Sequence, residues 1–297
     1  MDLRQASYVV AVADHHTFTA AAASIPVSQP ALSQAVAALE HELGTPLFHR
    51  LGRSVSLTAA GEAFVEPARR MLRDAEVARA AVADVAGLRR GRLDVVALPT
   101  LVVEPLVGLV GRFRAAHPGV LVRITEPEAA GDVLANVRSG ASELGLGDVV
   151  PTDDRTLAFD RVGRQELLAV LPPGSDAGTG ETLPIRRLAA HPLVTTPRGT
   201  STRRLLAAAL REDEEAPDPE IGVVTEHREA IVPLVMAGAG VAILPEPIAR
   251  LAEAAGAIVR RLSPALSREV VLVRRDGPLS PAAAAFRELA LGDGMHH

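Results

Sequence analysis

The sequence predicts an α/β protein that begins with an all-α winged helix-turn-helix. Two short helical segments flank a proline-containing break within the first 45 residues, which is the pattern of a helix-turn-helix. A helical pattern then runs from residue 58 to about residue 88. From residue 92 onward, short apolar runs alternate with helical segments, which predicts a mostly parallel α/β sheet that binds ligands beyond the carboxyl ends of its strands.

Composition sets limits on the kind of protein. The 297 residues fit two domains at roughly 150 residues each. With no cysteine, the chain has neither disulfides nor thiolate metal sites, and its nine histidines are scattered, so we expect no metal and no cofactor. No apolar run reaches the roughly 18 residues of a membrane span, and the N-terminus lacks the pattern of a signal peptide. We therefore expect a cytoplasmic protein with no membrane partner.

The charge balance argues against strong DNA binding by a single copy. The net charge is −5, and residues 1–60 hold three arginines against four acidic residues. Attraction to phosphates supplies most non-specific DNA affinity. One copy of this N-terminal segment is therefore expected to bind DNA weakly.

The first two helices are defined by their end signals. Residues 3–13 carry apolar side chains that suit a first helix. Thr17 precedes the alanine-rich run "FTAAAAS" as a candidate N-cap. Pro26 disfavours helical backbone at Ile25 and predicts the end of the second helix there.

The third helix has equally clear limits. Ser28 is a candidate N-cap, and Pro30 falls in the first turn, where its missing N–H costs nothing. Gly44 predicts the end of the helix after Leu43. The expected core-facing positions are Leu32, Val36, Leu39 and Leu43. The next stretch, "PLFHRLGRSVSLT", predicts two short strands around a Gly52-Arg53 turn, which would form a wing.

From Thr58 to about Leu88 the pattern predicts one long linker helix. Its apolar positions alternate spacings of four and three, as in a seam that packs against a second helix. The candidate dimerisation residues are Phe64, Ala68, Met71, Ala75, Ala78, Val82 and Val85. Packing of this helix on its own domain is the alternative. Pro67 is unfavourable inside a helix by about 3 kcal/mol, so either the helix kinks there or it begins later.

Beyond the Gly- and Arg-rich "GLRRGRLDV", strands and helices alternate. The predicted strands are 92–97, 120–125, 143–147, 166–171, 193–196, 220–225, 241–244 and 268–274. The predicted helices are 101–116, 128–139, 201–211, 227–238, 246–254 and 280–291.

This order of elements resembles the LysR-type transcriptional regulators. The stretches that carry the resemblance are "AAAASIPVSQPALSQAVAALEHELGTPLFHR" and "LTAAGEAF", followed by "RFRAAHPGVLVRI", "GASELGLGD" and "LVMAGAGVAILPE". The resemblance covers essentially the whole chain and is most specific in the N-terminal part.

The resemblance implies a domain organisation and partners. It divides the chain into a DNA-binding domain (1–58), a linker or dimerisation helix (59–90) and an effector-binding domain (91–292). The last would consist of two Rossmann-like subdomains of the periplasmic-binding-protein type, 92–161 plus 266–292 and 162–265. It also implies a small-molecule inducer in the cleft between them, a homodimer or homotetramer, and double-stranded DNA with an imperfect dyad operator.

The second helix of a helix-turn-helix enters the major groove, so its exposed N-terminal residues are the DNA-binding candidates. Gln and Ser side chains can bond to base edges, and proline can contact a thymine methyl. Helix N-termini and arginines suit phosphates. The candidates are Ser28, Gln29, Pro30, Ser33, Gln34, Arg50 and Arg53. A solvated helix face, or a capping role for Ser28, is the alternative. Members of the family often have basic residues on this helix, whereas Gln34, Ala37 and Ala38 are neutral.

Hydroxyl groups at helix starts suggest the effector site. Free N–H groups and the positive end of the helix dipole favour a carboxylate, and arginine pairs well with one. The effector-binding candidates are Thr100, Arg198, Thr200, Ser201, Thr202, Thr225, Glu226 and His227. Helix capping for the hydroxyls and solvent exposure for His227 are the alternatives. A small organic anion is the ligand class that this pattern favours.

Two other classes of function compete with a regulator. A stand-alone solute-binding protein would explain the cleft but not the N-terminal domain. The sequence lacks the motifs that would indicate an α/β enzyme. "GAGVAILP" precedes a strand instead of opening a helix, and there is no P-loop, GxSxG elbow or HExxH. We therefore expect a non-enzymatic, inducer-controlled, sequence-specific DNA-binding regulator.

Overall fold

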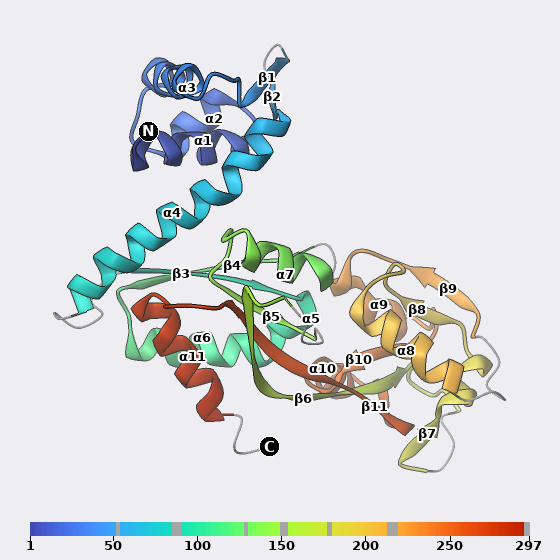
Figure 1. The fold of residues 1–297 in the computed structure, drawn as a ribbon. Coiled ribbons are helices and arrows are strands. Elements are labelled where there is room, and N and C mark those ends of the chain that lie inside the picture. The colour runs from blue at the N-terminus through green and yellow to red at the C-terminus, as the bar shows by residue number, and fades with distance from the viewer. Residues whose placement is uncertain are drawn as a thin grey trace.

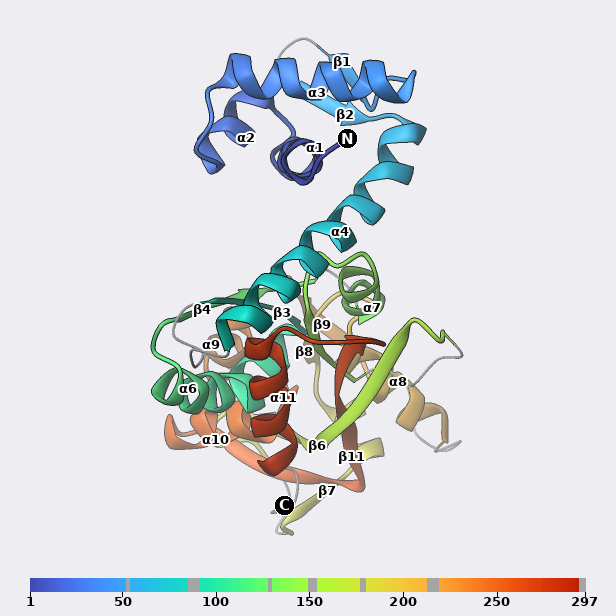
Figure 2. The same cartoon turned by 60° about the vertical axis from the view of Figure 1, so that its left-hand side comes forward.

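The computed structural model describes residues 1–51, 54–84, 91–127, 130–148, 154–176, 180–212 and 219–293. Figures 1 and 2 show a small N-terminal domain at one end, a larger α/β domain at the other, and one long helix, α4, that joins them. Among the described residues, no helix is long and apolar enough to cross a membrane.

The N-terminal domain consists of three helices and a two-stranded wing. They are α1 (Leu3–His15), α2 (Phe18–Ser24), α3 (Gln29–Leu43), β1 (Phe48–Leu51) and β2 (Ser54–Leu57). Thr17 caps α2 by accepting from the N–H of Ala20, and Ser28 caps α3 by accepting from the N–H of Ala31 at 3.4 Å. Gly44 ends α3 in the left-handed conformation, with φ 71°. The predicted caps, helix ends and wing strands are confirmed, and the Gly52-Arg53 turn lies outside the described residues.

Close backbone approach fixes the wing and the start of α4 (Ala59–Asp84) against α3. Glu40 of α3 accepts from the N–H groups of Leu47 and Phe48, at 2.7 and 3.2 Å. The hydroxyl of Thr58 caps α4 by accepting from the N–H of Gly61. A Cβ atom at Gly61 would lie 2.1 Å from the carbonyl oxygen of Leu47, so this position requires glycine. The tight junction explains part of the "LTAAGEAF" stretch.

The linker helix α4 is continuous through Pro67. It begins at Ala59, before the proline, so a later start is the wrong alternative. At its N-terminal end, Phe64 packs against the core of the N-terminal domain and Ala68 is 1% exposed. An ion pair between Arg69 and Asp14 joins α4 to α1. The first two positions of the predicted seam are thus already covered by this chain.

The α/β domain contains one seven-stranded mixed sheet with the order β10-β6-β11-β5-β3-β4, with β7 paired to β11. Its strands are β3 (Gly91–Ala97), β4 (Val120–Thr125), β5 (Leu144–Gly147), β6 (Leu157–Leu171), β7 (Thr182–Pro184), β10 (Ala242–Pro245) and β11 (Ile258–Arg275). A separate pair joins β8 (Leu193–Thr195) and β9 (Ile221–Val224). The pairs β3–β4 and β3–β5 are parallel, but β6–β11, β5–β11 and β6–β10 are antiparallel. The pair β7–β11 is also parallel, so three of the six strand pairs described in this sheet are parallel, and the sheet is mixed instead of mostly parallel.

Two long strands, β6 and β11, connect the two halves of the α/β domain. The half whose core contains Phe113 and Phe286 is called the first lobe. The half that holds two clusters, one around Leu188 and one around Val235, is called the second lobe. The sequence predicted only the 166–171 and 268–274 parts of the two strands, because the stretches 157–165 and 258–267 lack a continuous apolar pattern. Their full length appears only with their pairing.

The remaining helices cover the sheets. They are α5 (Pro99–Leu101), η1 (Val102–Leu106), α6 (Val107–Ala116), α7 (Ala130–Arg138), η2 (Ile185–Ala190), α8 (Ser201–Glu212), η3 (Arg228–Ala230), α9 (Ile231–Met236), α10 (Glu246–Ala254) and α11 (Pro281–Asp293). The predicted helix 101–116 is broken at Glu104, whose backbone is extended (φ −155°, ψ 133°) because Pro105 disfavours the helical conformation before it. The predicted helix 227–238 is shorter, since α9 begins only at Ile231.

A partly buried cluster of ion pairs joins α11 to β6 and β11. The carboxylate of Asp160 accepts from Arg287 Nε and Nη2 at 2.7 and 2.6 Å and from Arg274 Nε at 3.2 Å. The hydrogen bonds from Arg287, against the cost of desolvation, hold the pKa of Asp160 below its ordinary 3.8.

Replacing Asp160 with Asn should lower the free energy of unfolding by about 1–3 kcal/mol at pH 7, because the charge-assisted bonds are lost. Because the folded-state pKa is lowered, this stabilisation is complete above pH 3.8 and is lost as the pH falls through the folded-state value. Urea unfolding of both proteins at a series of pH values measures it. A stability difference that already disappears near pH ~6 would contradict this assignment, since carboxylates titrate far below that pH.

Candidate functional site

The exposed face of α3 is the candidate DNA-contacting surface. Gln29, Pro30 and Gln34 are exposed and Ser33 is half-buried, while Leu32, Val36 and Leu39 are buried on the opposite side of the helix. Among the described residues, no hydrogen bond engages the side chains of Gln29, Ser33 or Gln34. These side chains are thus available to an external partner. Ser28 is exposed and serves as the N-cap, as the alternative interpretation expected.

The candidate DNA-contacting residues of the wing are only partly described. Arg50 lies on β1 opposite Val55, but its side chain is not described, and Arg53 lies outside the described residues. Figures 1 and 2 show that α3 and the wing lie on the side of the N-terminal domain away from the α/β domain. This surface is therefore open to a large partner such as a duplex.

The effector cleft lies between the two lobes, where the carboxyl ends of several strands meet. It has a volume of about 430 Å³, within the range of small-molecule sites. One wall comes from residues after β3 and β4, including Thr100, Val103 and Glu126. The other comes from residues after β8 and β9 and from α8 and α10. Apolar side chains dominate its body: Leu98, Val103, Pro127, Leu193, Val194, Leu206, Ile231, Val232, Ile243, Leu244, Ile248 and Leu251.

A buried arginine organises the polar floor of this cleft. Arg268 of β11 is 4% exposed and donates to Thr100 Oγ1 at 2.6 Å and to Ser201 Oγ at 2.8 Å. Its Nε also donates to Gln165 Oε1 at 2.9 Å. Burial lowers the pKa of Arg268 to about 10; Asp148 opposes the shift and Arg204 adds to it. The guanidinium is therefore charged at neutral pH.

The hydrogen bonds distinguish which hydroxyl protons remain available. Ser201 donates its proton to Asp148, and Thr200 donates to the carbonyl of Pro197 at 3.1 Å. Thr100 only accepts, and its proton has no acceptor among the described residues. The side chain of Thr202, which also lines the cleft, has no partner there either. Thr100 and Thr202, together with the N–H groups of the first turn of α8, can thus donate to a ligand.

Five of the eight predicted effector residues line the cleft: Thr100, Thr200, Ser201, Thr202 and Glu226. The other three do not. Arg198 is exposed outside the lining, and Thr225 accepts from the N–H of His227 at 3.0 Å as a local turn. The side chain of His227 is 80% exposed and lies 3.4 Å from Glu229. These three positions follow their strands or precede α8 in sequence, but their side chains face solvent or the local backbone.

Sequence reasoning missed Arg268, Gln165 and Asp148. Arg268 and Gln165 lie within the polar parts of β11 and β6, which the apolar pattern did not assign to strands or placed at a strand end. Asp148 directly follows the buried strand β5 and is itself buried, with a side chain that is 3% exposed. The available signal was a charged residue at the carboxyl end of an apolar strand, the position where ligands bind in such sheets.

The mouth of the cleft carries the opposite charge to its floor. Glu126, Glu226, Arg228 and Glu229 line it, which sums to −2. Behind the floor residues Thr100 and Ser201, the buried group of Arg268, Arg204 and Asp148 sums to +1. A ligand with one negative charge at the floor fits this distribution, whereas a second negative charge at the mouth would be repelled.

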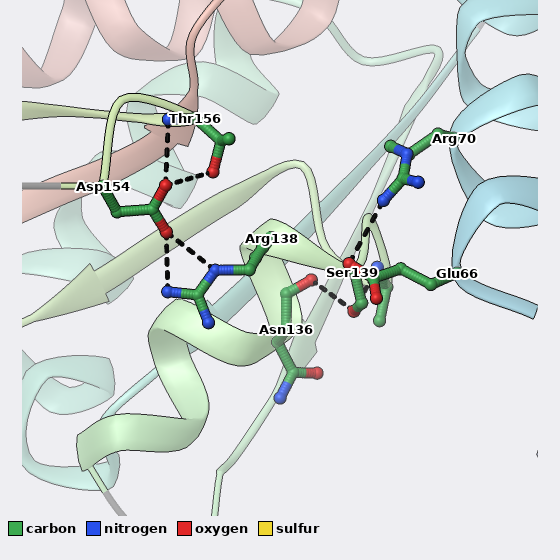
Figure 3. Close-up of polar contacts among 8 residues, drawn as sticks. Glu66, Arg70, Asn136, Arg138, Ser139, Asp154 and Thr156 are labelled. Atoms are coloured by element: carbon green, nitrogen blue, oxygen red, sulfur yellow. Dashed lines mark hydrogen bonds and ion pairs between the residues drawn. The ribbon is translucent and has the colours of Figure 1, made fainter. Parts of the chain in front are cut away.

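A second cavity, of about 740 Å³, separates α4 from the α/β domain. Figure 3 shows Arg138 of α7 and Thr156 converging on Asp154, while Glu66 and Arg70 come from α4. Arg138 Nε donates to Asp154 at 2.8 Å, and Thr156 Oγ1 donates at 2.6 Å. The cavity is also lined by Arg275 and Asp276 at the end of β11. The starting end of β6 and the final end of β11 therefore face the linker helix.

Comparisons with known proteins cover both halves of the chain. Residues 3–62 match the bacterial regulatory helix-turn-helix proteins of the lysR family, and residues 86–293 match the LysR substrate binding domain. The SDS degradation transcriptional activation protein of a Pseudomonas species is 33% identical over 300 residues, which span 98% of this chain and 96% of that protein.

Solved structures agree. The crystal structure of CbnR, a LysR family transcriptional regulator, has 26% identity and a TM-score of 0.68, with 99% of each chain covered. Full-length CbnR in complex with its target DNA gives the same identity and TM-score and covers 99% of this chain and 100% of that one.

Proposed function

Because the chain belongs to the LysR family of transcriptional regulators, we propose that α3 reads its DNA site and that a small organic monocarboxylate binds in the effector cleft. The protein is a DNA-binding regulator with a small-molecule-binding domain. What remains to be assigned is the set of residues that performs each task and the chemical class of the ligand.

For DNA, Gln29, Ser33 and Gln34 are the proposed base-reading residues. They are accessible, have no partner within the described part of the chain and lie in the N-terminal half of α3. That half enters the major groove in helix-turn-helix complexes. Ser28, Pro30, Arg50 and Arg53 are proposed backbone or methyl contacts. The DNA of the CbnR complex is that protein's own target and supports only the general arrangement.

For the ligand, the observation that carries the proposal is the buried, positively charged Arg268 behind two hydroxyl-bearing residues. Among the described residues, no carboxylate forms an ion pair with Arg268. Arg268 donates to Thr100 Oγ1, which leaves the hydroxyl proton of Thr100 for a ligand. A carboxylate there would also meet the N-terminus of α8. The apolar body of the cleft suits a hydrocarbon skeleton behind that carboxylate.

A thermal-stability screen of the full-length chain tests this ligand class. Each small monocarboxylate would be paired with its neutral amide and with a dicarboxylate of similar size. A ligand that binds the native state raises the melting temperature in a concentration-dependent way. The proposal expects stabilisation by monocarboxylates only. Stabilisation by the amides alone, or by the dicarboxylates alone, would rule it out.

The domain limits 1–58, 59–90 and 91–292, and the division into lobes at 161/162 and 265/266, are proposed on the same basis. The two groups of core residues support the lobes. The relatives are regulators, and we infer a cytoplasmic protein without catalytic activity.

We also propose that the exposed part of α4 joins two copies. Met71 and Ala75 are half-buried and Ala78 is exposed, while Phe64 and Ala68 pack within the chain. The side chain of Val82 is not described, and Val85 lies outside the described residues. A dimer would carry two N-terminal domains. Binding of one to DNA would raise the effective concentration of the other there, which offsets the weak DNA affinity expected of a single domain.

Substituting Ala75 with Glu should weaken self-association at least about ten-fold, because a charge would be buried in a small-residue seam. Sedimentation equilibrium of the full-length chain measures the association constant, and the affinity for operator DNA should fall with it. Ala59→Glu, an exposed alanine at the start of the same helix, is the matched control. Unchanged association of Ala75→Glu would remove α4 as the dimer contact.

A further inference from the structure

Asp148 is a buried carboxylate that the proposed ligand site does not use. It follows β5 in the first lobe, its side chain is 3% exposed, and it does not line the cleft. Burying a charge is costly unless partners compensate. The buried carboxylate of Asp148 therefore requires partners that compensate its charge.

The described partners of Asp148 all come from the second lobe. Its Oδ2 accepts a hydrogen bond from the hydroxyl of Ser201 and lies 3.0 Å from Arg204 Nη2. Both residues belong to α8, whose Leu206 packs in the core of the second lobe. The other oxygen, Oδ1, is buried and has no hydrogen-bond partner among the described residues. Asp148 thus gains its compensation across the cleft.

The same bonds reach Arg268 on the connecting strand. Ser201 accepts from Arg268 Nη1 at 2.8 Å while it donates to Asp148. The contacts therefore run from the cationic Arg268 through the hydroxyl of Ser201 to the anionic Asp148, and from there to the cationic Arg204. Opening of the cleft would separate Asp148 from both of its partners and leave a buried carboxylate uncompensated, which is strongly unfavourable.

We propose that Asp148, with Arg204 and Ser201, is an inter-lobe latch that keeps the effector cleft closed in the absence of ligand. The latch also fixes the rotamer of Ser201, so the hydroxyl faces Asp148 and Thr100 remains the donor to the ligand. If the closed cleft is the state that binds ligand, the apparent affinity is the intrinsic affinity multiplied by the fraction of molecules whose cleft is closed, so a weaker latch means weaker ligand binding. The latch rests on the proposed cleft, but its test uses no ligand, so failure of the latch is distinguishable from failure of the ligand assignment.

Hydrogen exchange of the full-length chain tests the latch. Two segments on different lobes are compared, 95–101 around the end of β3 and 196–204 around the start of α8. Asp148→Asn keeps the shape but removes the charge, and Arg204→Gln removes its cationic partner. Both should accelerate exchange in both segments about ten-fold, because opening becomes more frequent. Arg211→Gln, an exposed arginine farther along α8, is the matched control, and 29–43 in the N-terminal domain should not change.

Wild-type exchange rates in both segments of both variants would overturn the latch. Acceleration confined to 196–204 would also overturn it, because Arg204 would then stabilise only its own helix. If Asp148→Asn accelerates exchange everywhere, including 29–43, the variant is globally destabilised and Arg204→Gln alone decides, by the same two criteria.

Discussion

Replacing both Gln29 and Ser33 with Ala should lower the affinity of the full-length chain for its specific DNA site about 100-fold. Each base-edge contact of this kind contributes about 1–3 kcal/mol of discrimination. Both side chains lie on the accessible face of α3, and alanine is the best helix former, so the fold should be unaffected. Fluorescence anisotropy with a labelled operator at moderate salt measures the loss, and the melting temperature confirms folding.

The matched control is His41→Ala, an exposed residue at the opposite end of α3. It should bind the operator as the wild type does. Binding of non-specific DNA should change little in the double variant, because the substitution removes no phosphate-neutralising charge. A double variant that retains full specific affinity would show that base reading lies elsewhere.

Substituting Thr100 with Val should weaken the binding of a stabilising monocarboxylate by about 10–100-fold. The change removes the hydroxyl proton available to the ligand and also the acceptor of the Arg268 Nη2 bond. A hydrogen bond to a charged group contributes about 1.5–3 kcal/mol, which gives this range. Isothermal titration with the carboxylate that gives the largest thermal shift measures the loss.

Thr100→Ser restores the hydroxyl and should recover most of the affinity. His227→Ala is the second control, because the side chain of His227 is 80% exposed outside the cleft. Equal binding by wild type and Thr100→Val would mean that the carboxylate does not lie on the floor of the cleft. A loss with His227→Ala would mean that the ligand reaches beyond the mouth.

The N-terminal domain could be predicted from the sequence almost completely because its signals are local. Ser28, Pro30 and Gly44 act within one helical turn of their own positions, and the structure places the helix ends where they predict them. The same holds for the start of α8 at Ser201. The predicted helix at 101–116 failed at Glu104 although Pro105 was visible, because the apolar pattern was given more weight than the proline.

The effector cleft could be predicted only in part, because it is assembled by contacts far apart in sequence. Thr100 and Ser201 were accessible to prediction as hydroxyls at helix starts. Arg268 was not, because its role depends on β11 crossing behind both of them. The contacts of Arg268 with Thr100 and Ser201 can be inferred only once the pairing of β11 is known. Antiparallel pairing of β6 and β11, which makes the sheet mixed, is invisible to a pattern that follows one strand at a time.

Cleft and linker are joined by these two strands. Gln165 and Arg268 lie behind the cleft, within β6 and β11, while Thr156, just before β6, and Arg275, at the end of β11, line the cavity that faces α4. A change in lobe position therefore has a direct structural route to the linker helix. Such a route transmits a signal only if the ligand favours one of two states.

The most direct measurement is an anisotropy titration of the full-length chain with two labelled duplexes of equal length, the intergenic DNA beside its own gene and a scrambled sequence. The titration is run at low and moderate salt. The account predicts that the intergenic duplex binds at least about 1,000-fold more tightly at moderate salt, as specific sites do, and that the Gln29→Ala/Ser33→Ala variant loses this preference. Equal binding of both duplexes at every salt concentration would contradict sequence reading by α3.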